Sequence, residues 1–135
     1  MATAKKIILA LLLSLTMTKG LAPATPDWLD AWYRGYNVAL FDSELPDNVI
    51  IDHNYYDDEN MAITIAFNLN GIEHYRLAFN KRYEPSGKQG RETLIHEMCH
   101  VQMMVEKKKE LDSHGPLWQS CMHRVANKNG FESLW

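Results

Sequence analysis

The chain has 135 residues, of which 46% are hydrophobic and 23% are charged, and its formal net charge is -3. This length suits one domain with a real core and is too short for two, and the composition is ordinary for a globular protein. The small negative charge excludes a general attraction to nucleic acid or to anionic membranes. With only two cysteines, Cys99 and Cys121, the chain cannot form a four-cysteine zinc ribbon or a framework of several disulfides.

The first 24 residues are predicted to form either an apolar helix that packs on the domain or a signal segment. Lys5 and Lys6 precede an apolar run at 7–13, which is too short to span a bilayer. A signal peptide would use these lysines as its charged start and the Ala-Pro-Ala at 22–24 as its cleavage site. Lys19 and Gly20 interrupt the segment that leads to this cleavage site, so we favour the packed helix. The domain is then expected at 25–135. We expect a cytoplasmic protein, or a secreted one if the segment is cleaved.

Beyond this segment, hydrophobic periodicity predicts three helices and three short strands. Thr25-Pro26 is typical of a helix cap followed by a proline in the first turn. Asn70-Gly71 predicts a tight turn between two paired strands. In chain order we expect a helix at 27–41, strands at 49–51, 61–67 and 72–79, and helices at 92–111 and 114–127, with Gly130 beyond the last helix. Strands segregated from helices indicate an α+β fold.

The strand at 72–79 is a candidate edge strand beside the 92–111 helix, where a peptide substrate could add as a further strand. An ordinary hairpin strand explains the pattern equally well. His74 and Tyr75 on this strand could help to hold an oxyanion, although a plain surface position is the favoured interpretation.

The pentapeptide His96-Glu97-Met98-Cys99-His100 fits the H-E-x-x-H pattern on the predicted 92–111 helix. A helix turns about 100° per residue, so His96 and His100 lie on one face and can bind one metal ion. Glu97 points about 100° away, which leaves it free to act as a general base on a water held by the metal. Zinc lowers the pKa of such a water to near 7. The pattern also occurs by chance, but its apolar neighbours indicate a buried helix, where these polar groups are costly unless paired or metal-bound.

A catalytic zinc needs a third protein ligand and one open position. The metzincin pattern is excluded, because positions 103 and 106 hold methionine and glutamate in place of glycine and histidine. Glu106 and Glu110, taken as part of the same helix, would point away from the two histidines. His114 follows a predicted helix break and opens the last helix together with a Gly-Pro pair. His114 is therefore the expected third ligand, with Asp112 as the alternative.

Several segments of the chain together resemble the SprT-like family. The most specific are L-I-H-E-M-C-H at 94–100 and H-G-P-L-W at 114–118; the others lie at 36–46, 77–80 and 122–125, and the resemblance spans roughly 28–130. It implies a gluzincin-like α+β fold and cleavage of protein substrates, which in some members are crosslinked to DNA. By the same resemblance, His96, His100 and His114 would be the zinc ligands and Glu97 the catalytic acid and base.

The leading hypothesis is therefore a monomeric zinc endopeptidase that hydrolyses protein substrates through a zinc-bound water activated by Glu97. The alternative is a catalytically weak or inactive zinc-binding module that acts in protein or DNA–protein complex binding. Glu97 argues against this alternative, because a structural zinc site needs no base and is normally closed by four protein ligands. The resemblance allows DNA association, but the net charge of -3 does not support it.

Other noticeable residues are assigned structural roles. A Cys99–Cys121 disulfide is expected only in an exported protein. The lysines at 107–109 are interpreted as an exposed helix end rather than a nucleic-acid patch. We expect core positions for Trp28, Trp32 and Trp118 and structural or solvated positions for His53 and His123.

Overall fold

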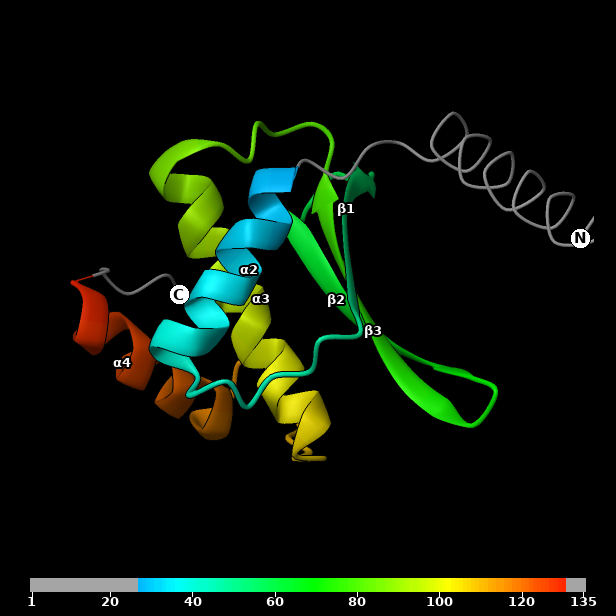
Figure 1. Ribbon diagram of the computed structural model, residues 1–135, viewed down its shortest axis with the longest axis vertical. Helices are drawn as coiled ribbons and strands as arrows, with labels where there is room; N and C mark the ends of the chain where they lie inside the picture. The colour runs from blue at the N-terminus through cyan, green and yellow to red at the C-terminus, as the bar shows by residue number, and fades with distance from the viewer. Residues whose placement is uncertain (1–26, 131–135) are drawn as a thin grey trace, which may run out of the picture.

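A computed structural model describes residues 27–130 of the chain. Its elements, labelled as in Figure 1, are α2 (Asp27–Leu40), β1 (Val49–Tyr55), β2 (Ala62–Leu69), β3 (Ile72–Asn80), α3 (Gly87–Val105) and α4 (Pro116–Asn129). This order confirms the predicted α+β fold. The predicted segment 1–24 and the Thr25-Pro26 cap lie outside the described residues. Within 27–130, no helix combines the length and the apolar character needed to cross a bilayer.

The three strands form one mixed sheet in the order β1-β3-β2. β3 pairs with β1 in parallel and with β2 antiparallel, so β3 is the central strand. Of the two interpretations of the 72–79 strand, the edge strand is therefore wrong and the hairpin strand is confirmed. The consecutive buried residues Leu77, Ala78, Phe79 and Asn80 are typical of a strand covered on both faces. β2 is an outer strand of the sheet instead, and the predicted turn at Asn70-Gly71 joins it to β3, with both turn residues at positive φ.

The long helix α3 is the structural centre of the domain. It contacts β2, α2 and α4, and in Figure 1 it lies between the sheet and α4. The buried core around it consists of apolar side chains from every element, among them Leu29, Leu77, Leu94, Met98, Val101, Trp118 and Met122. The position of α3 is thus fixed by packing against α2, β2 and α4.

Both ends of α3 differ from the predicted 92–111. The helix begins at Gly87 and ends at Val105. Lys107 adopts a left-handed conformation with φ of 53°, and the backbone N–H of Lys108 bonds the carbonyl of Met103, which closes the helix. The residues that follow are free to turn back toward the helix. The last helix matches its prediction closely, and Gly130 caps it at φ of 65°.

Candidate active site

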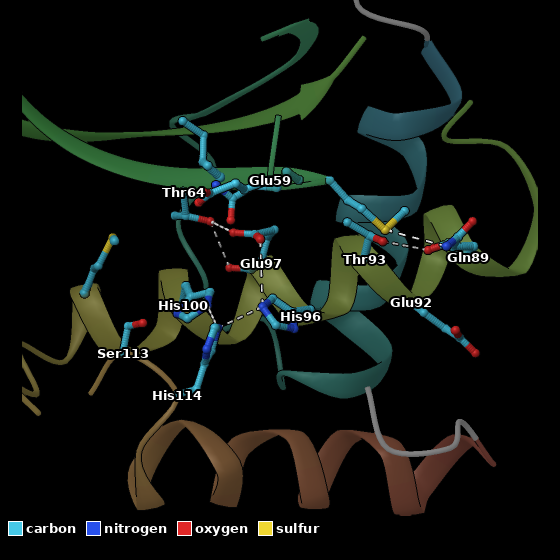
Figure 2. A pocket seen from close by; sticks show the side chains of 15 residues that line it. Glu59, Thr64, Gln89, Glu92, Thr93, His96, Glu97, His100, Ser113 and His114 are labelled. Atoms are coloured by element: carbon cyan, nitrogen blue, oxygen red, sulfur yellow. Dashed lines mark hydrogen bonds and ion pairs between the residues drawn. The ribbon is translucent and has the colours of Figure 1, made fainter. Parts of the chain in front are cut away.

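Three histidines from two separate segments meet beside α3. His96 and His100 lie one turn apart on the helix, and His114 reaches them from the turn before α4 (Figure 2). The Nε2 atom of His114 is 3.1 Å from Nε2 of His96 and 3.1 Å from Nε2 of His100. Within the described residues, these three form the group of potential metal-ligating side chains whose donor atoms converge on one point.

The geometry of the three rings and the lowered pKa values of two of them suit a metal ion. Nitrogens bound at about 2.0–2.1 Å around a tetrahedral zinc lie roughly 3.3 Å apart, close to the separations found here. Burial lowers the pKa of His96 to about 4, with a smaller contribution from His114. Burial also lowers the pKa of His100 to about 3, helped by the two neighbouring histidines. His96 and His100 are therefore neutral at pH 7, which leaves a lone pair available on each ring for a metal.

His114 is held in place by carboxylates of the turn between α3 and α4. Oδ1 of Asp112 accepts a hydrogen bond of 2.9 Å from the backbone N–H of His114. The Glu110 carboxylate accepts hydrogen bonds from the backbone N–H groups of Leu117 at 2.7 Å and Trp118 at 3.3 Å, and so caps α4. Both acids thus act as partners of the backbone, and neither belongs to the group that converges on the metal position.

Gly115 allows this turn to be as tight as it is. A Cβ atom at Gly115 would lie 2.9 Å from the carboxyl carbon of Glu110 and 3.0 Å from the carbonyl oxygen of Asp112. Any larger residue would have to displace the cap or the turn. The His-Gly pair therefore combines a candidate ligand with the residue that lets its backbone approach closely.

Trp118 forms a buried wall against all three histidines. Its ring centroid is 4.6 Å from that of His96, 5.4 Å from that of His100 and 4.6 Å from that of His114. Its indole N–H donates a hydrogen bond of 3.3 Å to the carbonyl oxygen of His96. Trp118 is fully buried, as predicted, but it also restricts the orientation of the three rings.

A disulfide between Cys99 and Cys121 joins α3 to α4. Both cysteines are buried, and Cys99 directly precedes His100 in the chain. The bond therefore fixes the helix that carries two of the histidines to the helix that follows the third.

The side chain of Glu97 points from α3 toward the sheet, and one of its carboxylate oxygens faces the histidines. It is 5% exposed, and its Oε2 accepts a hydrogen bond of 2.5 Å from the hydroxyl of Thr64 on β2. Its other oxygen, Oε1, lies 4.0 Å from Nε2 of His96. Burial raises the pKa of Glu97 to about 7, although the Thr64 hydrogen bond opposes this rise. A carboxylate with this pKa can exchange a proton near neutral pH.

A cleft of about 530 Å³ runs between β2 and α3 and contains the histidines and Glu97 (Figure 2). Residues 59–64 form its sheet side, and Gln89, Glu92, Thr93 and Met104 line its helix side. β2 is therefore the strand that borders the site, whereas the predicted strand, β3, lies behind it. Chain segments that bind in this cleft would lie along an outer strand.

His74 and Tyr75 play no part in this cleft. Tyr75 is 5% exposed and belongs to the core, so the predicted surface position is wrong for this residue. His74 is half-buried and stacks on Phe67 across the β2–β3 pair. His53 binds the carbonyl oxygens of Asn80 and Tyr83 through Nε2, which confirms its structural role.

Sequence reasoning missed three residues that shape the site: Thr64, Glu110 as a helix cap, and Trp118 as the wall of the metal position. Glu110 lies six residues before Pro116, so its capping depends on a turn that no local pattern reveals. Thr64 lies in an apolar strand, and its isolated hydroxyl was the available signal that it has a polar partner.

Comparison with known proteins identifies the family that this chain resembles. The model of the SprT-like family matches residues 29–133. A protein of Caenorhabditis elegans named DNA-dependent metalloprotease dvc-1 is 45% identical over 40 residues, which make up 29% of this chain and 11% of that protein. The similarity to the worm protein thus covers about a tenth of its length, whereas the family match covers nearly all of the described residues.

Proposed function

This chain belongs to the SprT-like family, and on that premise we propose that it is a zinc-dependent metallopeptidase that hydrolyses peptide bonds in proteins. The observation that carries this proposal is the convergence of three imidazole nitrogens beside a buried carboxylate, inside a cleft bordered by an outer strand. We assign His96, His100 and His114 as the metal ligands and Glu97 as the catalytic base.

The chemistry divides between the metal and the protein. Zinc, when bound by the three histidines, would act as a Lewis acid that acidifies water and polarises the scissile carbonyl. Glu97 accepts a proton from the attacking water and delivers it to the leaving amine, a role that suits its raised pKa of about 7. Both transfers use Oε1, the carboxylate oxygen that faces the histidines.

The substrate backbone is proposed to pair with β2. β2 is an outer strand and its residues 62–64 line the cleft, so an extended peptide paired with its open edge would bring its carbonyl groups past Glu97 and the histidines. Main-chain hydrogen bonds to a strand edge bind a peptide largely without regard to its sequence. This arrangement suits an endopeptidase that acts on extended or unfolded segments of proteins.

Metal analysis and one conservative substitution test the proposal. The purified protein is expected to contain about one zinc per chain, and His114→Ala is expected to lose most of it. Glu97→Gln should keep the zinc but lower hydrolysis of casein by roughly 100-fold or more, because an amide cannot accept the proton. Equal activity of wild type and Glu97→Gln would remove Glu97 from this role, and a zinc-free active protein would refute the metal assignment.

DNA is an additional variable in this assay, because the worm relative is named a DNA-dependent metalloprotease. Casein hydrolysis measured with and without single-stranded DNA tests whether this chain shares such dependence. Its net charge of -3 favours an activity that does not depend on DNA.

A further inference from the structure

The half-buried hydroxyl of Thr64 binds Glu97 from the opposite side of the cleft. Thr64 lies in β2, where it pairs with Leu77 of the central strand, so its backbone position is set by the sheet. Its Oγ1 lies 2.5 Å from Oε2 of Glu97 and 3.4 Å from the backbone carbonyl oxygen of the same residue. Thr64 therefore links the sheet to α3 at Glu97.

The hydroxyl has one proton to donate, and the nearer acceptor is the carboxylate oxygen Oε2. This hydrogen bond occupies Oε2 and fixes the rotation of the carboxylate plane. Oε1 is left facing the histidines, 4.0 Å from Nε2 of His96. Without the hydroxyl, the carboxylate could rotate and present either oxygen, or neither, to the water.

We propose that Thr64 is a positioning residue for the reaction, which anchors one oxygen of Glu97 so that the other is held ready to accept a proton. This inference rests on the proposed peptidase function and adds a residue from the strand that borders the substrate cleft. Thr64 acts through Glu97 and need not touch the substrate. Because a base misplaced by about 1 Å can lower a rate by roughly 100-fold, the loss of the anchor should affect turnover strongly.

Thr64→Val and Thr64→Ser form a matched pair for the test. Valine has nearly the same shape as threonine but lacks the hydroxyl, whereas serine keeps the hydroxyl and loses only a methyl group. We expect Thr64→Val to lower kcat for a fluorogenic peptide by about 10- to 100-fold, with KM changed by less than about threefold. Thr64→Ser should recover most of the lost kcat. Zinc content should stay at the wild-type level in both variants, because Thr64 is not among the residues whose donor atoms converge on the metal position.

A second comparison separates positioning from structural damage. In a Glu97→Asp background, the carboxylate is one methylene shorter and is expected to lose its hydrogen bond to the hydroxyl, so adding Thr64→Val should lower kcat by much less than it does in the wild type. Equal effects of Thr64→Val in the two backgrounds would overturn the inference, as would wild-type kcat in Thr64→Val itself. If Glu97→Gln abolishes activity while Thr64→Val does not, the peptidase proposal stands and only the role of Thr64 falls. If the zinc-loaded wild type hydrolyses no peptide, both are refuted.

Discussion

Removing the disulfide between Cys99 and Cys121 should cost the fold a large part of its stability. The bond closes a loop with a sequence separation of 22. In the chain-entropy description, closing a loop of that length in the unfolded state stabilises the fold by about 3 kcal/mol. A domain of roughly 100 residues has an unfolding entropy of about 0.2 kcal/mol/K, so the melting temperature should fall by roughly 15 °C.

Thermal unfolding followed by circular dichroism checks this value in protein stripped of metal. Wild type is measured with and without reductant, and the double substitution Cys99→Ala/Cys121→Ala serves as the matched control. The variant should melt near the reduced wild type and should not respond to reductant. If oxidised and reduced wild type melt within about 3 °C of each other, the bond contributes far less than its loop length implies.

Zinc adds a second comparison. If the ion binds only to the folded state, it raises the stability of the disulfide-bonded and bond-free proteins by the same amount, and the difference between them persists. We expect this result, because Trp118 also holds α4 against α3 and the Glu110 cap fixes the turn that carries His114. A larger difference in the presence of zinc would show that the bond itself orients His114.

Two further predictions concern the same region. The metal-free protein should be less stable toward urea at pH 5 than at pH 7. His96 and His100, whose pKa values are lowered to about 4 and about 3, stay neutral in the folded state at pH 5 but gain protons near pH 6.5 in the unfolded state, which favours unfolding. Glu97, whose pKa is raised to about 7, has the opposite effect, but it is one group against two. Greater stability at pH 5 would contradict this sign. Glu110→Ala, which removes the cap of α4, should lower the unfolding free energy by about 1 kcal/mol in urea titrations, and an unchanged value would show that the cap is not needed.

The fold class and the histidine pair could be predicted because they depend on local patterns. The one-turn spacing of His96 and His100 follows from helix geometry alone, and the glycine at 130 marks the helix end by its left-handed conformation. His114 could be selected because a Gly-Pro pair is typical of a new helix start, and the structure brings it to 3.1 Å from both other rings.

What could not be predicted depends on contacts between distant segments. Strand order is such a property, and it placed β2 rather than β3 beside the cleft, although the unbroken buried run at 77–80 was a readable sign of a central strand. The end of α3 at Val105 was missed because it depends on the left-handed conformation of Lys107, a residue type with no strong preference for that state. Trp118 was correctly placed in the core, but its contact with three histidines requires the chain reversal before α4.

The two halves of the proposed chemistry are supported from opposite sides of α3. The orientation of the base, Glu97, depends on β2 through the hydrogen bond from Thr64. The third histidine depends on α4, through the cap and the wall formed by Trp118. Because these contacts share no partner other than α3 itself, their energetic effects should be nearly additive. Substitutions on the β2 side should therefore alter turnover at constant zinc content, whereas substitutions on the α4 side should alter stability or metal retention while leaving the base in position.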